Sequence, residues 1–232
     1  MNYNLFNGKK KIPKMVHQIF FNFFGELEEN KIFHKSHTEF KGLEGFEYIL
    51  WGEDECENLV IESFPEYHDL YSNFKYKIQK IDFVRFAILY KYGGMYVDLD
   101  MLPLKNPAEL LSNNEENLIF HNIRHVKKNY SYIENDFMAS VEKNDFWVKI
   151  CEYCNEQYFE KMKMDIYDTW KGRFILQTTG PKMLSRFVRG EYPKIKPKKL
   201  VYTKWNKDSD ENYYFKDYKL NTWIKNKDKK VI

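Results

Sequence analysis

Two aspartates, Asp98 and Asp100, have the most evident chemistry in this sequence. They stand one residue apart at the end of a short apolar run, Met95–Leu99, which is predicted to be a strand. Side chains two residues apart on a strand share a face, so both carboxylates would point the same way. Two converging carboxylates form a hard oxygen site suited to Mg²⁺ or Mn²⁺, and such ions commonly bridge to a substrate diphosphate. The sequence therefore predicts a metal site, with two acids in a solvated turn as the alternative.

Asp82 and Arg85 form a second candidate group. They lie three residues apart on a predicted helix, so they share one face, beside the apolar stripe of that helix. In one interpretation Asp82 accepts hydrogen bonds from sugar hydroxyls and Arg85 contacts phosphate or sugar. The other interpretation is an ordinary ion pair on a solvated surface. The Gly93-Gly94 turn favours the functional interpretation, because it brings the helix back against the strand that ends at Asp98.

Other polar positions are less specific. Asn135 and Asp136 lie in a predicted strand and place a polar pair near a sheet edge. His17 falls in an apolar strand, where a core histidine bonded to backbone is favoured over a metal ligand. His121 and His125 are four residues apart without an accompanying acid in a metal-protease pattern, so neither is expected to act.

The elements that must position these residues follow from hydrophobic periodicity. Four apolar residues spaced three to four apart predict a core-facing helix over residues 77–92, and the glycine pair ends it. Strands alternating with helices indicate an α/β sandwich with a mainly parallel sheet, whose ligands lie beyond the carboxyl ends of the strands. Strands are predicted at 15–20, 46–51, 95–99, 118–121 and 133–137, and helices within 26–41 and at 53–63, 77–92, 144–161 and 181–189.

The size and charge of the chain limit its class. A length of 232 residues allows one α/β domain, and a net charge of +3 does not indicate a nucleic-acid partner. The charge is uneven, since residues 182–232 hold 15 Lys and Arg against 6 Asp and Glu. This basic segment could contact an anionic membrane surface or phosphates, or be a solvated face without a partner.

The number of cysteines and the lengths of the apolar segments indicate where in the cell the protein is expected. Cys56, Cys151 and Cys154 offer no disulfide framework, which favours a reducing compartment. The first 14 residues are polar and basic, and no segment approaches the length of a membrane span. We therefore expect a cytoplasmic protein, soluble or peripheral to a membrane. The absence of a nucleophile elbow, a P-loop and a dinucleotide fingerprint removes the commonest hydrolase and nucleotide-loop interpretations.

Several stretches share the order and spacing of one known family. They are Ile12-Pro13-Lys14-Met15-Val16-His17-Gln18-Ile19, Leu50-Trp51, Asp82-Phe83-Val84-Arg85, residues 89–100, Asn135-Asp136-Phe137-Met138-Ala139 and Thr179-Gly180-Pro181. Together they resemble the family 32 glycosyltransferases, which carry a DXD sugar-binding motif. This family includes fungal-type mannosyltransferases and bacterial or viral polysaccharide enzymes. The similar region runs from about residue 12 to residue 190, with residues 191–232 expected to complete the site within a single domain.

The resemblance implies a fold and a reaction. It implies a Rossmann-like GT-A fold, a UDP- or GDP-linked sugar donor, Mn²⁺ or Mg²⁺, and a glycan or polysaccharide acceptor, with the donor's configuration retained. By position, Asp98 and Asp100 would anchor the metal and the donor, and Asp100 is favoured as the direct ligand. Asp82 and Arg85 would hold the donor sugar and diphosphate. Asn135 and Asp136 would lie near the transferred sugar and the acceptor. The residues assigned to donor binding are His17, Phe20, Gly93, Gly94, Tyr96 and Trp223.

Two positions depart from the family pattern. Phe20 stands where members usually have a tryptophan that stacks on the nucleobase. Near the C-terminus Trp223 fits, but the expected histidines are missing, and Asp217 or Asn221 could replace them as ligands. These departures leave a non-catalytic sugar-nucleotide-binding module as one alternative. The other is a phosphatase of the haloacid-dehalogenase type, which is disfavoured because its Asp-x-Asp motif normally lies near the start of the chain.

Overall fold

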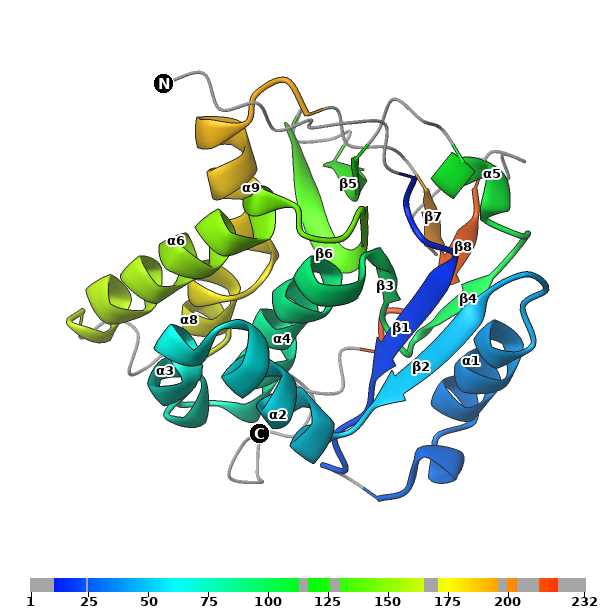
Figure 1. Cartoon of the computed structure of the whole chain (residues 1–232), viewed down its shortest axis with the longest axis horizontal. Coiled ribbons are helices and arrows are strands. Elements are labelled where there is room, and N and C mark those ends of the chain that lie inside the picture. Colours follow the sequence, from blue (N-terminus) through cyan, green and yellow to red (C-terminus); the bar gives the residue numbers. More distant parts are fainter. Residues whose placement is uncertain are drawn as a thin grey trace.

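A five-stranded sheet, in the order β2-β1-β3-β6-β5, forms the centre of the molecule (Figure 1). The computed structural model describes residues 11–23, 25–112, 117–125, 130–164, 171–195, 200–203 and 213–220. Strands β1, β2 and β3 are parallel to one another, and β6 runs antiparallel to both β3 and β5. Four of the five strands thus point the same way, which confirms the predicted α/β fold with a mainly parallel sheet. The strands are β1 (Met15–Ile19), β2 (Glu47–Trp51), β3 (Gly94–Val97), β5 (Leu118–His125) and β6 (Tyr130–Ser140).

Helices cover both faces of this sheet. One face packs against α2 (Glu53–Ser63), α4 (Lys77–Tyr92), α6 (Asp145–Met162), α8 (Lys171–Thr178) and α9 (Pro181–Glu191). The other packs against α1 (Lys31–Lys41), α5 (Ala108–Ser112) and a small sheet of β4 (Met101–Pro103), β8 (Phe215–Asp217) and β7 (Val201–Thr203). Short helical turns lie at Leu27–Glu29, Pro65–Tyr67 and His68–Ser72 (α3). Successive side chains of β3 alternate between the two cores, as a doubly covered strand requires.

The structure extends some predicted elements and adds others. The strands expected at 118–121 and 133–137 are parts of the longer β5 and β6, which pair as one antiparallel hairpin. The strand expected to reach Leu99 ends at Val97. Helix α8 and the strands of the small sheet were not predicted. Strands of three residues are too short to show a clear alternation, so periodicity does not reveal them.

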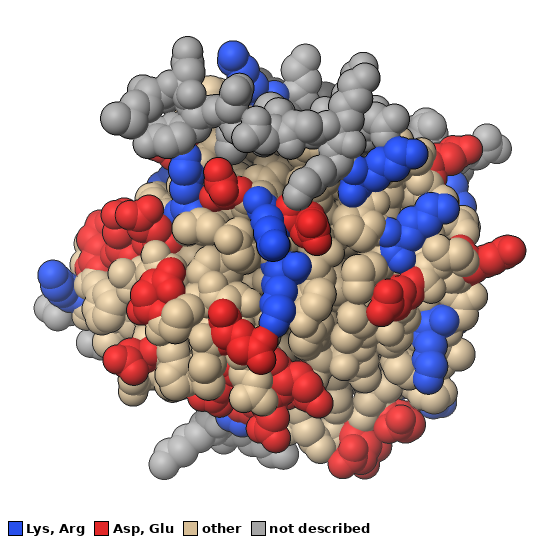
Figure 2. Space-filling model, in the orientation of Figure 1, with Lys and Arg blue, Asp and Glu red and all other residues tan. Residues whose placement is uncertain are grey.

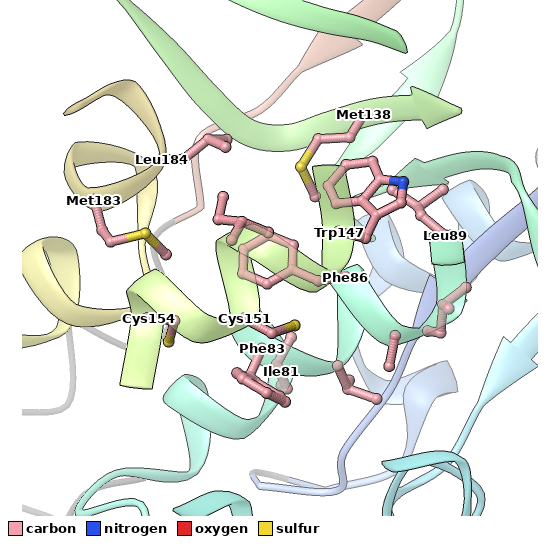
Figure 3. Close-up of a cluster of buried hydrophobic side chains, with 14 of the residues drawn as sticks. Ile81, Phe83, Phe86, Leu89, Met138, Trp147, Cys151, Cys154, Met183 and Leu184 are labelled. Carbon is pink, nitrogen blue, oxygen red and sulfur yellow. The ribbon is translucent and has the colours of Figure 1, made fainter. Parts of the chain in front are cut away.

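Helix α4 lies in the hydrophobic core, where its apolar side chains pack with those of α6 (Figure 3). Its Phe86 ring stacks on Trp147 of α6, with the ring centroids 5.9 Å apart. A helix buried on nearly every side leaves little room for a solvated charged face. Asp82 and Arg85 are accordingly only 5% and 4% exposed. The interpretation of this pair as a surface ion pair is therefore wrong.

The same core holds two of the cysteines. Cys151 and Cys154 of α6 are fully buried and unpaired, and burial raises the pKa of both thiols. Cys56 of α2 is also buried and unpaired. A buried thiol with a raised pKa is unreactive. The side chains of Cys151 and Cys154 thus pack as part of the core.

The Gly93-Gly94 turn brings α4 back against the sheet. Both glycines have positive φ, +65° and +79°, which favours residues without a side chain. A Cβ atom on Gly94 would lie 2.7 Å from the Met15 carbonyl oxygen, and one on Gly93 would lie 2.7 Å from the Glu142 nitrogen. Only glycine therefore allows α4, β1 and β3 to approach this closely. The turn fixes the distance between the Asp82–Arg85 face and the end of β3.

Candidate active site

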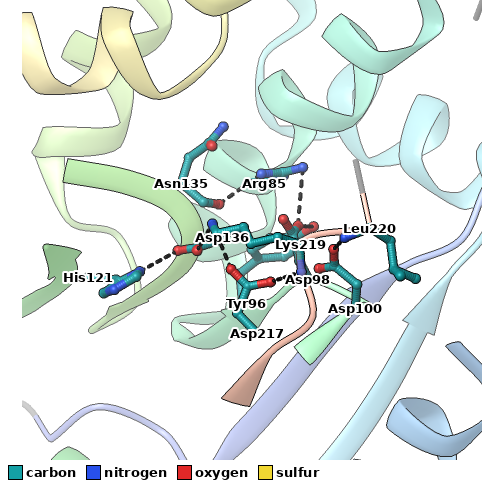
Figure 4. Close-up of polar contacts among 10 residues, drawn as sticks. All are labelled: Arg85, Tyr96, Asp98, Asp100, His121, Asn135, Asp136, Asp217, Lys219 and Leu220. Atoms are coloured by element: carbon teal, nitrogen blue, oxygen red, sulfur yellow. Dashed lines mark hydrogen bonds and ion pairs between the residues drawn. The ribbon is translucent and has the colours of Figure 1, made fainter. Parts of the chain in front are cut away.

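Asp98 and Asp100 lie in a turn at the carboxyl end of β3. The Asp98 N–H donates to the Asp136 carbonyl at 2.9 Å, and the Met101 N–H donates back to the Asp98 carbonyl at 3.1 Å. This turn, and not a continuing strand, sets the direction of the two carboxylates, so the argument from strand alternation is wrong. Both side chains are nevertheless part-exposed, and they lie beside the same cluster of charged groups (Figure 4). The end of a parallel strand is where ligands bind in α/β sheets.

Arg85 is the hub that joins α4 to this turn (Figure 4). Its guanidinium forms ion pairs with Asp82 and Asp98, each at 3.3 Å. It also donates to the Asn135 carbonyl at 2.8 Å and lies over the Tyr96 ring, 4.7 Å from its centroid. Tyr96 completes the cluster by donating its hydroxyl to Asp98 at 2.6 Å. One buried cation thus holds both carboxylates in fixed positions.

Both oxygens of Asp82 accept hydrogen bonds from other elements. The Asn135 side-chain amide donates to one at 2.9 Å, and the Thr179 hydroxyl donates to the other at 3.1 Å. Burial raises the pKa of Asp82, while Arg85 and the two hydrogen bonds favour the ionised form. The sequence placed Thr179 only within the family-like stretch Thr179-Gly180-Pro181, and its partner on α4 is 97 residues away in sequence.

A β-bulge in β6 sets the positions of Asn135 and Asp136. The ladder with β5 passes from Phe120–Met138 directly to His121–Glu134, so residues 135–137 have no partner on β5. Bulges of this kind redirect side chains and free backbone groups. The Asn135 carbonyl, in the stretch without a partner on β5, accepts from Arg85. The Asp136 carbonyl accepts from the Asp98 N–H, one residue beyond the β3–β6 ladder. These two contacts attach β6 to α4 and to the turn that carries the two aspartates.

His121, which was not expected to act, contacts the candidate site residue Asp136. It is 2% exposed, and its Nδ1 donates to the Asp136 carboxylate at 2.8 Å. The other Asp136 oxygen accepts from Lys219 at 3.2 Å. Burial alone would raise the pKa of Asp136, but His121 and Lys219 hold it well below its usual range. The spacing of His121 and His125 gave no signal because the partner comes from the neighbouring strand.

The segment after β8 closes the site from the other side. The Tyr218 N–H donates to the Asp100 carbonyl at 3.0 Å, and the Leu220 N–H donates to the Asp100 carboxylate at 2.9 Å. Burial, with the charges of Asp217 and Asp98, raises the pKa of Asp100 to about 7. Asp217 is buried and forms an ion pair with Lys219 at 2.6 Å. Asn221 and Trp223 lie outside the described residues.

The donor set suits a divalent cation bound together with a diphosphate. Two cations, Arg85 and Lys219, lie among five aspartates, so the site has an excess of negative charge; the aspartates are Asp82, Asp98, Asp100, Asp136 and Asp217. In the described part of the chain, no three His, Cys, Asp or Glu side chains are arranged to hold a metal ion. Mg²⁺ is typically bound through one or two carboxylates, with substrate phosphates and water supplying the remaining oxygens. Asp98 and Asp100 fit that requirement.

The remaining residues assigned to donor binding lie around β1. His17 is fully buried, and its Nε2 donates to the Gly93 carbonyl at 3.0 Å, while its Nδ1 accepts from Trp51 at 3.2 Å. The interpretation of His17 as a core histidine bonded to backbone is thus confirmed. Phe20 follows β1 and is half-buried. His17 therefore supports the glycine turn, and its assignment to donor binding stays a prediction, as does that of Phe20.

The buried state of His17 gives a testable pH dependence. Burial lowers its pKa to about 4, so the folded protein keeps it neutral while the unfolded chain binds a proton below pH 6.5. Stability is therefore lost as the pH falls through this window, by roughly 3 kcal/mol in total. Urea unfolding of the wild type and of His17→Gln between pH 7.5 and 4 should show a loss that is larger in the wild type by roughly 3 kcal/mol, because the other titrating groups are the same in both proteins. Parallel curves for the two proteins would contradict it.

Comparison with known proteins identifies the region that contains the two aspartates. Residues 29–117 match the family described as glycosyltransferase sugar-binding region containing DXD motif. This part of the chain is similar to the DXD sugar-binding region of glycosyltransferases. Asp98-Leu99-Asp100 lies inside the matched residues, so the resemblance noted in the sequence is confirmed.

Individual relatives agree with this result. An uncharacterised glycosyltransferase of Acanthamoeba polyphaga mimivirus is 35% identical over 102 residues, which are 43% of this chain and 40% of that protein. The mannosyl phosphorylinositol ceramide synthase SUR1 of Saccharomyces cerevisiae is 27% identical over 79% of this chain and 44% of its own length. The DXD glycosyltransferase region is thus related to a mannosyltransferase. This chain spans less than half the length of either relative.

A solved structure supports the fold. The PaToxG glycosyltransferase superimposes with a TM-score of 0.51 over 79% of this chain and 71% of that one, at 14% identity. This likeness shows the fold alone. The expected GT-A fold is confirmed.

Proposed function

We propose that this chain transfers a hexose from a nucleotide-diphosphate sugar, UDP- or GDP-linked, to a glycan or polysaccharide acceptor, with retention of configuration. One observation carries the proposal. Arg85 joins the buried Asp82 to Asp98, at the point where a parallel strand ends in a DXD turn. This arrangement supports a role for Asp82 and Arg85 in holding the sugar and a role for Asp98 and Asp100 in holding a metal-bound diphosphate.

The side chains of the site have different proposed roles in the reaction. Asp98 and Asp100 would hold Mn²⁺ or Mg²⁺, which acts as a Lewis acid on the leaving diphosphate when bound. Arg85 fixes Asp98 and adds positive charge close to where the leaving group becomes negative. Asp82 and Asn135, bonded to each other at 2.9 Å, would orient the sugar hydroxyls. Charge-assisted contacts of this kind hold the sugar in a reactive orientation.

Asp136 is proposed to lie on the side of the site where the acceptor binds. Its side chain is held in the ionised form. Its two oxygens bind His121 and Lys219, and both contacts favour the ionised form over the whole neutral pH range. We propose no covalent intermediate, because attack by the acceptor on the face from which the diphosphate leaves also retains configuration. The role of Asp136 would then be electrostatic, stabilising positive charge on the sugar ring.

The basic C-terminal segment is proposed as a peripheral membrane contact, and the expected cytoplasmic location stays a prediction. Figure 2 shows acidic side chains gathered over α2, whose first turn holds Glu53, Asp54 and Glu55. This surface would repel an anionic membrane, so contact would use residues 182–232 instead. No helix in the described part of the chain is long and apolar enough to cross a bilayer.

A donor screen tests the proposed function. We expect Mn²⁺-dependent hydrolysis of at least one of UDP-glucose, UDP-galactose, UDP-N-acetylglucosamine and GDP-mannose, because water can replace the acceptor slowly. GDP-mannose is included because the name of the yeast relative specifies mannosyl transfer. Release of UDP or GDP is measured with Mn²⁺ and with EDTA. Metal-dependent binding without turnover would support the non-catalytic module, and hydrolysis of a phosphomonoester alone would support the phosphatase.

A further inference from the structure

Helices α8 and α9 and the residues that follow them carry an excess of positive charge. Residues 171–195, all of which the structure describes, hold six Lys and Arg against one Asp or Glu. The net charge of the whole chain is only +3, so this excess is a local feature. Helix α2 has the opposite composition, with five Asp and Glu and no Lys or Arg between Glu53 and Ser63. The two signs of charge are therefore separated within the layer of helices.

The cations of α9 lie on one side of that helix. Lys182, Arg186 and Arg189 are spaced four and three residues apart, and all three are exposed. Residues at this spacing are neighbours on a helix surface. The other side of α9 packs into the core through Met183, Leu184, Phe187 and Val188. Lys182, Arg186 and Arg189 thus form the basic face of α9, a straight row about 10 Å long.

Contacts with neighbouring elements fix the orientation of this basic face. The Ser185 hydroxyl accepts from the Ile133 N–H of β6 at 2.6 Å and donates to the Ile133 carbonyl at 3.0 Å. On the exposed side, Arg186 donates to the Gln157 side chain of α6 at 3.2 Å. The helix is therefore held against the sheet before any partner binds, and a preorganised surface loses less entropy on binding.

The basic face begins beside the candidate site and lies away from the acidic surface. Thr179, three residues before Lys182, donates to Asp82 at 3.1 Å. Helix α2 packs against α4, α4 against α6 and α6 against α9, so two helices separate α2 from α9 (Figure 1). Glu160 of α6 lies near Arg186, but it forms an ion pair with Lys161 at 2.6 Å. A flat anionic surface can therefore approach α9 without meeting the acids of α2.

We propose that the basic face of α9 binds the anionic headgroups of a membrane surface. The assignment rests on the membrane contact proposed above for residues 182–232, and it places that contact on Lys182, Arg186 and Arg189. A straight row of fixed cations suits a flat surface of negative charge, and each cation close to such a surface adds to the attraction. Nucleic acid is the alternative anionic partner.

Vesicle binding by two double variants tests the assignment. Co-sedimentation of the whole chain is measured with phosphatidylcholine vesicles, with and without about one third phosphatidylserine, at low ionic strength. Lys182→Gln combined with Arg189→Gln removes two charges from the basic face and keeps Arg186. Lys35→Gln combined with Lys41→Gln is the matched control. Both of these lysines are exposed on α1, on the other face of the sheet, and the net charge changes by the same amount.

The wild type should bind the vesicles that contain phosphatidylserine and not the neutral ones. The α9 double variant should bind about 10- to 30-fold more weakly, because each cation near an anionic surface contributes a factor of about five. The α1 double variant should match the wild type within about twofold. Equal binding by the α9 variant and the wild type would overturn the assignment to α9. A wild type that does not distinguish the two kinds of vesicle would overturn the proposed membrane contact itself.

Two further measurements use the wild-type chain. Acetylation followed by mass spectrometry should show that vesicles with phosphatidylserine protect Lys182 and leave Lys35 unchanged, and that neutral vesicles protect neither. Equal acetylation of Lys182 with both kinds of vesicle would overturn the assignment. Duplex DNA, added at the same phosphate concentration as the anionic lipid, should not release the protein from the vesicles. Release by DNA would assign the basic face to nucleic acid and overturn the membrane assignment.

Discussion

Replacing Asp100 by asparagine should lower metal-dependent turnover of the sugar nucleotide by about 1,000-fold, because a directly bound cation supplies several kcal/mol of charge stabilisation. Asparagine has nearly the same shape and keeps an oxygen that can accept the Leu220 N–H bond. The substitution therefore removes the negative charge with little change in packing. Turnover is measured as release of UDP or GDP at saturating Mn²⁺.

Two comparisons separate this effect from a loss of folding. Asp69→Asn removes one carboxylate from an exposed position on α3 and should leave turnover unchanged. The thermal midpoint of Asp100→Asn should equal or exceed that of the wild type, because burial and the neighbouring charges of Asp217 and Asp98 disfavour the ionised form of Asp100. Turnover of Asp100→Asn within tenfold of the wild type would show that Asp100 does not hold the cation.

Replacing Arg85 by methionine should destabilise the protein by about 3–5 kcal/mol, the usual effect of removing one partner from a buried ion pair. Asp82 and Asp98 would both lose their cation, and the Asn135 carbonyl would lose its donor. Methionine fills a similar volume, so the loss reflects charge rather than a cavity. The free energy of unfolding is measured by urea denaturation at pH 7.5.

A second substitution tests the cause of that loss. Arg85→Met combined with Asp82→Asn should be more stable than Arg85→Met alone, because one uncompensated carboxylate is gone. Arg186→Met is the matched control, since Arg186 is exposed on α9 and donates to the Gln157 side chain at 3.2 Å. It should change stability by less than about 1 kcal/mol. Equal losses for Arg85→Met and Arg186→Met would contradict the role of Arg85 as the hub.

Local sequence patterns predicted the elements whose structure is determined by a short stretch of the chain. The stripe on α4 and the glycine pair after it located the core helix and the turn, because periodicity and positive φ are properties of short segments. The pattern also indicated that Asp82, Arg85, Asp98 and Asp100 belong together. It did not show that Arg85 is buried, because three-residue spacing is the same on a solvated and on a buried helix face.

The contacts that complete the site come from distant parts of the chain. Thr179 bonds to a residue 97 positions away, Lys219 to one 83 positions away and Leu220 to one 120 positions away. The bulge in β6 also changes which residues face His121, and simple alternation along a strand cannot reveal such a shift. Contacts set by sheet register and by loop closure are therefore absent from any local pattern.

The central claim is that Asp98 and Asp100 bind a divalent cation together with a nucleotide diphosphate. The most direct test is calorimetric titration of UDP and GDP into the wild type and Asp100→Asn, each with Mn²⁺ and with EDTA. We predict that Mn²⁺ tightens binding of one diphosphate by the wild type at least about tenfold, a difference of about 1.4 kcal/mol, and has no such effect on Asp100→Asn. Equal affinity of the wild type with Mn²⁺ and with EDTA would contradict the claim.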